Sequence, residues 1–244
     1  MHTPAPFLIV QTGQPVASMR RHGGFPQWIR TAAGLRRADA VAVDVESGAP
    51  LPDGRDFTGV ILTGSGAMVT ERRDWSERTA AWLAQTAHAG VPVFGICYGH
   101  QLLAHALGGT VGNNAAGREM GTVSLSLEAA AAHDALFAGL PRTLPAQATH
   151  VQSVLQPPAG ATVLATSALD ACHAFRWGDA AWGVQFHPEF SRTHMLGYVR
   201  ARRDALRAEG LDARLIERSV RAAPVARRVL RRFVAVARGA RATP

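Results

Sequence analysis

The segment Pro92–Gln101, PVFGICYGHQ, constrains the fold more than any other part of the sequence. A short apolar run ends at Cys97, which stands among small residues, and an apolar helical pattern over Leu102–Leu107 follows it. This order predicts a buried strand, a sharp turn with the thiol at its apex, and a helix that runs back over the sheet. A helix N-terminus favours the thiolate form of a cysteine placed there.

Strands and helices alternate through the first half of the chain. Buried strands are predicted over Phe7–Gln11, Ala40–Val45, Gly59–Thr63 and Val91–Ile96, and helices over Pro26–Leu35 and Asp74–Ala89. This alternation predicts an α/β fold with a doubly wound, mostly parallel sheet. A ligand site is expected at the carboxyl ends of such strands, where the loop Gly64–Ala67 and Cys97 can meet.

The second half of the chain has a different pattern. After Gly108, short strands separated by turns, one of them over Gln147–Val154, predict a smaller antiparallel sheet beside the parallel one. Helices are predicted over Arg192–Ala208 and Asp212–Ala222, and an amphipathic helix begins at Pro224. We expect a domain over residues 1–191 and a basic helical C-terminal extension over residues 192–244, packed on or beside it. Docking of the last helix on its own domain is favoured over binding to a partner or a membrane surface.

Composition restricts the class of protein. The net charge is +8, all 26 basic residues are arginine, and the basic C-terminal stretch contains only two aromatic residues, Tyr198 and Phe233, too few for a stacking platform. We therefore expect a solvated basic surface and no nucleic-acid partner. No apolar run reaches the roughly 18 residues of a membrane span, and the N-terminus lacks the basic start of a signal peptide. Two cysteines, Cys97 and Cys172, are too few for a disulfide framework, which predicts a cytoplasmic protein without a membrane partner.

A cysteine nucleophile needs a base and a group that orients the base. His187 lies in the stretch QFHPE, just after a predicted strand over Trp182–Phe186. Glu189, two residues later, can reach the far ring nitrogen of this imidazole. The sequence therefore predicts Cys97 as nucleophile, His187 as base and Glu189 as orienting carboxylate.

Other polar residues carry weaker signals. Cys97 and its neighbouring histidines lack the spacing of a zinc site, so we expect no metal and no cofactor. Structural roles are favoured for His100, His105, His150 and Cys172. Arg118 and Glu119 either contact substrate or pair with other residues, and the sequence leaves both alternatives open.

The motif Gly-Ile-Cys-Tyr-Gly-His-Gln around Cys97, together with Phe-His-Pro-Glu around His187, resembles the class I (triad) glutamine amidotransferases. The similarity extends from the first strand to about Phe190. In particular, Thr63–Trp75 and Gly117–Gly121 resemble segments of stand-alone proteins related to the amidotransferase domain of GMP synthase. The resemblance implies a flavodoxin-like, doubly wound α/β domain with an added antiparallel sheet.

The resemblance also implies a reaction and a set of site residues. In this family a cysteine thioester forms on the γ-carbonyl of glutamine, and glutamate and ammonia are released. The backbone N–H groups of Tyr98 and Ser65 would form the oxyanion hole, although Gly-Ser-Gly stands here where the family often has Gly-Gly-Pro. The small-molecule substrate would be bound by Gly64, Gln101, Val151 and Gln152. Since the family usually has a small residue at position 151, the valine would tighten the pocket or alter what fits.

Three functions remain as hypotheses. The first is a class I glutamine amidotransferase that passes ammonia to a separate synthetase, because no P-loop or nucleotide-pyrophosphatase motif occurs in this sequence. The second is a stand-alone γ-glutamyl peptide or γ-glutamyl amine hydrolase. The third is an inactive regulatory or binding subunit that docks through its basic C-terminal helices, against which the complete triad argues. The sequence does not define the leaving group, the identity of a synthetase or the oligomeric state.

Overall fold

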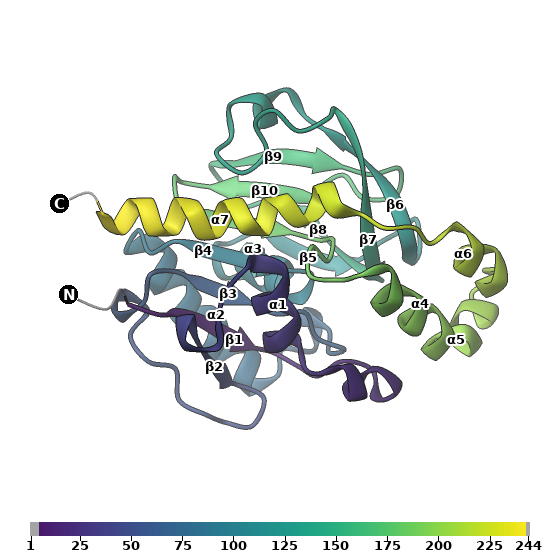
Figure 1. The fold of residues 1–244 in the computed structure, drawn as a ribbon, viewed down its shortest axis with the longest axis horizontal. Coiled ribbons are helices and arrows are strands. Elements are labelled where there is room, and N and C mark those ends of the chain that lie inside the picture. Colours follow the sequence, from purple (N-terminus) through teal and green to yellow (C-terminus); the bar gives the residue numbers. More distant parts are fainter. Residues whose placement is uncertain (1–4, 243–244) are drawn as a thin grey trace.

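A nine-stranded mixed sheet with helices on both faces forms the framework of the protein (Figure 1). The computed structural model describes residues 5–242. Residues 1–4, part of the segment considered for a signal peptide, and 243–244, the end of the expected extension, lie outside the described residues. The strands are β1 (Phe7–Gln11), β2 (Ala40–Asp44), β3 (Val60–Leu62), β4 (Val93–Ile96), β5 (Thr110–Asn113), β6 (Glu119–Leu127), β7 (Thr143–His150), β8 (Gln152–Gln156), β9 (Ala161–Thr166), β10 (Ala174–Trp177) and β11 (Ala181–Val184). The α-helices are α1 (Phe25–Ala33), α2 (Asp74–His88), α3 (Tyr98–Ala106), α4 (Arg192–Ala201), α5 (Arg203–Ala208), α6 (Ala213–Ser219) and α7 (Pro224–Ala242).

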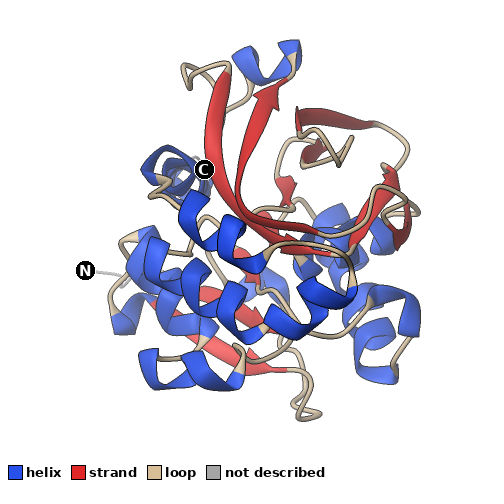
Figure 2. Cartoon of the chain, turned by 90° about the vertical axis from the view of Figure 1, so that its right-hand side faces the viewer, coloured by secondary structure: helices blue, strands red, loops and turns tan. Residues whose placement is uncertain are grey.

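The sheet order is β2-β1-β3-β4-β11-β10-β9-β6-β7. The first five strands in this order pair in parallel, and the remaining pairs are antiparallel. Strands β5 and β8 form a separate two-stranded antiparallel sheet. The predicted α/β fold class is therefore confirmed, and most of the antiparallel strands extend the parallel sheet. Figure 2 shows long antiparallel strands curving away from the helices that cover the rest of the sheet.

The apolar run in strand β1 contributes side chains to the hydrophobic cores on both faces of the sheet. Phe7 and Ile9 point to the face covered by α1 and α7, and Leu8 and Val10 point to the face covered by α2 and α3. Because side chains alternate along a strand, a strand buried on both faces needs an unbroken apolar run. All four side chains are at most 2% exposed, as this run predicts.

The pairing of β4 with β11 places the predicted nucleophile beside the predicted base. Ile96, the last residue of β4, lies opposite Val184, the last residue of β11, in a parallel register. The next residue, Cys97, donates its N–H to the carbonyl of Val184 at 2.8 Å. The chain segments that carry Cys97 and His187 therefore leave the same edge of the sheet side by side.

Two element boundaries differ from the prediction. The single strand expected over Gln147–Val154 is wrong, because β7 ends before Val151 and β8 begins after it. The carbonyl of Val151 accepts a hydrogen bond from Asn114 N–H at 2.9 Å, and the chain passes there from the large sheet to the small one. The single helix expected over Arg192–Ala208 is also broken. At Arg202 the N–H is shared between two carbonyls at 3.1 and 3.3 Å, and α5 starts in a new direction.

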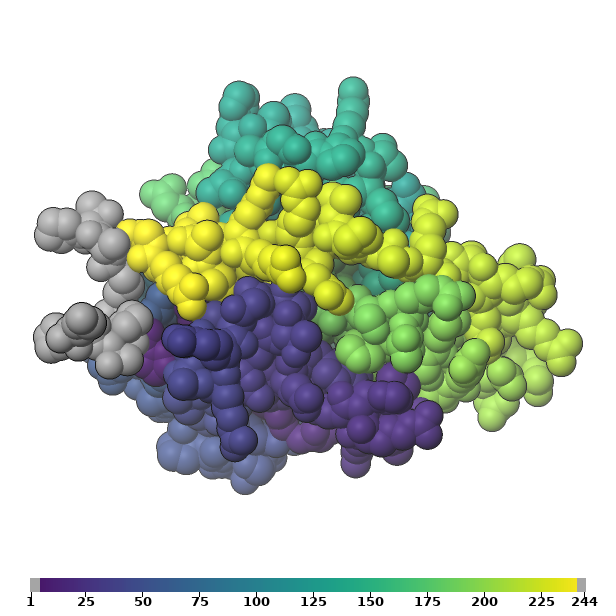
Figure 3. All heavy atoms as spheres, viewed as in Figure 1, coloured from purple at the N-terminus to yellow at the C-terminus, as the bar shows by residue number. Residues whose placement is uncertain are grey.

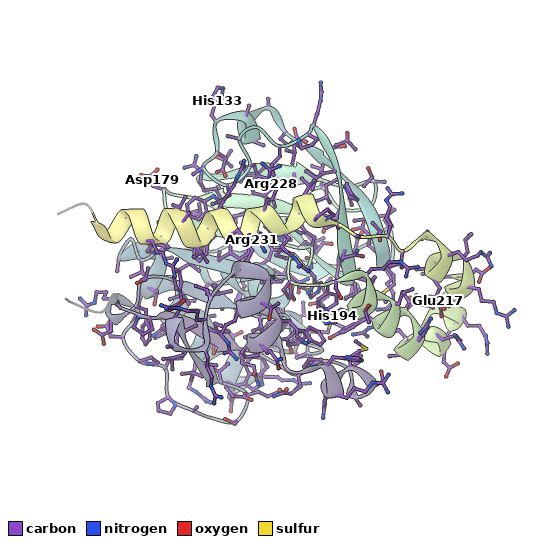
Figure 4. The ribbon with its side chains drawn as sticks, viewed as in Figure 1. His133, Asp179, His194, Glu217, Arg228 and Arg231 are labelled. Atoms are coloured by element: carbon purple, nitrogen blue, oxygen red, sulfur yellow. The ribbon has the colours of Figure 1, made fainter. Side chains whose placement is uncertain are left out.

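Helices α4 to α6 pack near the carboxyl ends of the parallel strands. They share a third apolar cluster with the segment Ala17–His22 and with α1, in which Trp28 stacks on His194 at a ring distance of 3.9 Å. Figure 4 shows His194 on the side of α4 that faces α1. Among the described residues, no helix is both long enough and apolar enough to cross a membrane.

Helix α7 is a part of the main core. Its apolar side is buried, and Phe233 contacts Phe7, Phe94 and Trp182 with ring distances of 6.4, 5.2 and 6.2 Å. In the space-filling view the yellow helix lies between α1 in purple and the teal β6–β7 region (Figure 3). Arg231 donates to the carbonyl of Ala32 in α1 at 3.0 Å, which fixes the helix on the domain. A domain boundary at residue 191 remains a proposal. Helix α7 lies beyond that residue and yet packs into the core of the central sheet.

Replacing Phe233 with Ala should destabilise the whole protein by about 3–5 kcal/mol, because a large ring is lost from a packed core. Urea unfolding followed by circular dichroism measures this change. The matched control is Arg228→Ala, an exposed position on the same helix, for which we expect a change below about 0.5 kcal/mol. A Phe233→Ala protein as stable as the wild type would show that α7 docks without contributing to the core.

Candidate active site

The turn that carries Cys97 is a strained elbow. Cys97 has φ 52° and ψ −102°, in the left-handed half of backbone space that residues with a side chain rarely adopt. The tight packing of α3 against the strand requires glycine on either side. A Cβ on Gly95 would lie 2.4 Å from the carbonyl oxygen of Gly99, and one on Gly99 would lie 2.6 Å from Cβ of Leu62. The glycine spacing predicted from the sequence is therefore a packing requirement.

The imidazole of His187 lies between the thiol and a buried carboxylate. Nδ1 of His187 is 2.8 Å from Oε1 of Glu189, and the backbone N–H of His187 is held by the carbonyl of Gln147 at 2.8 Å. Burial disfavours the charged imidazole, but Glu189 and the sulfur of Cys97 together outweigh it and raise the pKa of His187 to about 10. The structure thus brings the three predicted catalytic residues into one cluster, with His187 as an imidazolium at neutral pH.

The loop after β3 closes against this cluster. A Cβ on Gly64 would lie 3.0 Å from Cε1 of His187 and 3.7 Å from Cβ of Cys97, so only glycine lets the loop approach so closely. Thr12 holds the start of the loop through hydrogen bonds of 3.0 Å to Thr63 Oγ1 and 2.9 Å to the carbonyl of Thr63.

Two backbone N–H groups near the sulfur have no acceptor among residues 5–242. One belongs to Ser65 in this loop, and the other to Tyr98, the first residue of α3, whose N–H has no intrahelical partner. The side chain of Tyr98 anchors the helix start, because its hydroxyl is 2.6 Å from Oγ of Ser76. These groups are free to stabilise an oxyanion that forms on the oxygen of a carbonyl group attacked by the sulfur.

A small cavity of about 40 Å³ opens beside Cys97 on the side of α3 and β8. Of the four residues expected to bind substrate, Gln101, Val151 and Gln152 line it, whereas Gly64 does not and lies instead against His187 and Cys97. Nε2 of Gln101 donates to the carbonyl of Gln152 at 2.7 Å and to Oε1 of Gln185 at 2.9 Å, so Oε1 of Gln101 stays available as an acceptor. Nε2 of Gln152 donates to Thr70 at 2.7 Å, which holds this amide in place.

A buried hydrogen-bonded network supports the end of β7. Oε2 of Glu119 lies 3.0 Å from Nε2 of His150 and 2.7 Å from Nε2 of His173, and these two imidazoles lower the pKa of the carboxyl although burial opposes them. Among the described residues these three are the only group with metal-ligating atoms close together, and here both Nε2 atoms pair with the carboxylate of Glu119. Both alternatives left open for residues 118 and 119 remain predictions. Arg118 forms two hydrogen bonds of 2.7 Å with Glu209, but it also lines the cavity beside Cys97.

The remaining residues expected to be structural are buried or paired. His100 is fully buried, and burial lowers its pKa to about 3, so the ring is neutral. His105 lies 3.2 Å from Glu77 at the surface. Cys172 is buried away from the elbow, and burial raises its pKa to about 12, which leaves an inert thiol.

The sequence did not indicate Tyr198 and Arg202, which come from α4 and its end and line a second cavity next to Cys97. Arg202 belongs to an arginine-rich stretch with Arg200 and Arg203, so its composition gives no signal that separates it from its exposed neighbours. The break of the helix at this residue is the structural feature that distinguishes it.

Comparison with known proteins agrees with this geometry. The family model for glutamine amidotransferase class-I matches residues 22–200. The chain is 30% identical over 181 residues to one subunit of the glutamine-hydrolysing GMP synthase of Methanoregula boonei, covering 73% of this chain and 90% of that protein. It is also 30% identical over 146 residues to gamma-glutamyl peptidase 5 of Arabidopsis thaliana, covering 58% of each.

The fold is shared with solved structures. A glutamine amidotransferase from Thermotoga maritima superposes with a TM-score of 0.74 at 21% identity, covering 97% of this chain and 99% of that one. The chain spans about a quarter of the length of the full-length GMP synthases that it matches.

The raised pKa of His187 predicts a pH-dependent stability. A folded-state pKa of about 10, above the ordinary 6.5, contributes stability that is fully present below pH 6.5 and is lost as the pH rises through 10. Glu189→Gln removes the carboxylate charge, so its free energy of unfolding should fall less between pH 7 and 10 than that of the wild type. Urea unfolding at a series of pH values measures both curves.

The control for this experiment is Asp179→Asn, a fully exposed carboxylate, which should leave the slope of the wild-type curve unchanged. Parallel curves for the wild type and Glu189→Gln would mean that the carboxylate does not hold the proton on His187.

Proposed function

Since this chain belongs to the glutamine amidotransferase class-I family, we propose that it hydrolyses the γ-amide of glutamine, or of a related γ-glutamyl compound, through a thioester on Cys97. The observation that carries this proposal is the elbow of Cys97 beside the buried His187–Glu189 pair. Such a pair favours a thiolate with an imidazolium next to it, which is the reactive state of a cysteine nucleophile.

In the first step the thiolate of Cys97 attacks the γ-carbonyl carbon. The carbonyl oxygen becomes an oxyanion, which the N–H groups of Ser65 and Tyr98 stabilise because they have no other acceptor. Each such donor is worth roughly 3 kcal/mol in barrier height. The imidazolium of His187 then gives its Nε2 proton to the leaving nitrogen, the carbon–nitrogen bond breaks, and ammonia or an amine departs.

In the second step water attacks the thioester carbon. His187, now neutral, takes a proton from this water, and the bond between carbon and sulfur breaks to release glutamate and restore the thiolate. Glu189 keeps the ring in one orientation and stabilises its charged form in both steps, since Nδ1 is directed at its carboxylate.

The acyl part of the substrate would occupy the cavity beside Gln101. Its free Oε1 can accept from the α-ammonium group, and the amide of Gln152 forms another wall. Val151 lies between β7 and β8 at this cavity, where its side chain narrows the space. The small volume supports a pocket that is specific for the γ-glutamyl group.

The fate of ammonia is a separate proposal. The relative from Methanoregula boonei is by name one subunit of a GMP synthase, which supports a separate synthetase as the acceptor here. An inactive regulatory subunit is less well supported, because the proposed base is paired with the proposed carboxylate and lines the same cavity as the proposed nucleophile. Both cysteines are free and buried, which supports a reducing compartment, and we therefore infer a cytoplasmic location.

A second candidate function differs only in the leaving group. The cavity on the His187 side of Cys97 has a volume of about 210 Å³, far more than ammonia needs. This favours a γ-glutamyl peptide or amine hydrolase, with the same two chemical steps.

Replacing Cys97 with Ala should lower the rate of ammonia release from glutamine by more than about 10⁴-fold, because no other group can form the thioester. A coupled glutamate assay measures the rate. The matched control is Cys172→Ala, which removes the other buried thiol and should retain the wild-type rate per folded molecule. Wild-type protein that hydrolyses neither glutamine nor any γ-glutamyl compound would falsify the proposed function.

A further inference from the structure

The cavity on the His187 side of Cys97 lies where the leaving group must be. His187 lines it, and His187 protonates the leaving nitrogen in the proposed mechanism. The cavity shares Cys97 and Arg202 with the smaller acyl-side cavity, so one substrate can extend through both. Its volume of about 210 Å³ is several times the roughly 30 Å³ that a water-sized molecule such as ammonia occupies in a liquid.

The positive charge of this cavity favours a leaving group that carries a negative charge. Arg20 and Arg202 line it, and none of the described residues in its wall is acidic. A leaving amine with an additional positive charge, such as a polyamine, would therefore meet the like charges of Arg20 and Arg202. A leaving group with a carboxylate would meet opposite charge.

Arg202 is distinguished by having no direct partner for its charge, because the carboxylate of Glu209, which attracts it from a distance, is already hydrogen-bonded to Arg118. Among residues 5–242 its side chain makes no hydrogen bond or ion pair, its Nε is buried, and its nearest aromatic contact is the ring of Tyr198 at 5.9 Å. Arg118, in contrast, is matched by two hydrogen bonds to Glu209. Since a partly buried guanidinium without a partner is destabilising, its position beside the nucleophile indicates that a ligand supplies the anion.

Part of the cavity wall is apolar. Pro15, Val16 and Phe25 line the cavity together with the ring of Tyr198. These surfaces suit an apolar side chain, while the guanidinium of Arg202 suits a carboxylate.

We propose that the substrates of this site are γ-glutamyl peptides whose leaving residue is an apolar amino acid with a free carboxylate, and that Arg202 binds that carboxylate. The inference rests on the proposed function and specifies its leaving group. Cys97 attacks the γ-carbonyl, the isopeptide carbon–nitrogen bond breaks, and the amino acid leaves with a proton from His187. Water then releases glutamate from the thioester, so the net reaction consumes one peptide and one water and yields two amino acids.

The test compares two substrates that differ only in charge: γ-glutamyl-leucine and γ-glutamyl-leucinamide, in which an amide replaces the leucine carboxylate. Wild-type protein should have a kcat/KM at least about tenfold higher for the acid than for the amide, since a charge-assisted pair is lost in the latter. In Arg202→Met this ratio should fall to near one, chiefly because KM for the acid rises. Arg202→Lys should keep part of it, because an ammonium group retains the charge without the paired donors.

The matched control is Arg200→Met, an exposed arginine on α4 that pairs with Glu217 and does not line the cavity, so the wild-type ratio should persist. A wild-type ratio near one, with glutamine still hydrolysed, would overturn the inference and leave the proposed function standing. A ratio unchanged in Arg202→Met would overturn the role of Arg202. Absence of hydrolysis of any γ-glutamyl compound by the wild type would overturn both. If Arg202→Met does not fold, the wild-type ratio still tests the substrate class, and the ratio in Arg202→Lys still tests the role of Arg202.

Discussion

The left-handed backbone at Cys97 is the constraint on which the site depends. A non-glycine residue in such a conformation costs of order 1–3 kcal/mol, and it persists only where the surroundings hold it. Here β4 and α3 hold it, because Gly95 and Gly99 let the helix approach the sheet to a distance that no Cβ permits. The same turn leaves the N–H of Tyr98 without an acceptor among the described residues and places the sulfur at the edge of the sheet. One strained residue would therefore provide both the proposed nucleophile and half of the proposed oxyanion hole.

Strand order supplies the rest of the chemistry. Because β11 pairs in parallel with β4, two segments far apart in sequence leave the sheet at adjacent points, and His187 reaches the sulfur without a long loop. Burial would ordinarily remove the charge from this imidazole. Glu189, itself buried, makes the charged state favourable, and the ion pair is kept in place by the hydrogen bond from His187 N–H to the strand β7. The strained backbone of Cys97 and the buried His187–Glu189 pair are thus both held in place by strands and helices of the main sheet.

The sequence predicted the features that follow from local pattern. The apolar runs located the parallel strands, and the glycines around Cys97 located the elbow, since each depends on neighbouring residues. The break at Val151 was missed because Gln147–Val154 contains no glycine, proline, asparagine or aspartate that would indicate a turn at the junction. The importance of α7 to the core was also hidden. An amphipathic pattern shows that a helix has an apolar side, but only the three-dimensional arrangement shows that Phe233 meets three aromatic rings of the central sheet.

Substrate selection could not be predicted for a related reason. The acyl-side cavity is formed by residues next to the motif, such as Gln101, whereas the leaving-group cavity is formed by the loop after β1 and by α4, which contribute Val16 and Tyr198. These segments meet only because α4 packs against α1 near the carboxyl ends of the strands. The proposed binding role of Arg202 rests on the absence of a direct carboxylate contact, and no local sequence pattern shows which arginine of a basic stretch lacks one. The residues proposed for the reaction chemistry and those proposed for substrate choice therefore lie in different parts of this chain, and the first are far easier to recognise from sequence than the second.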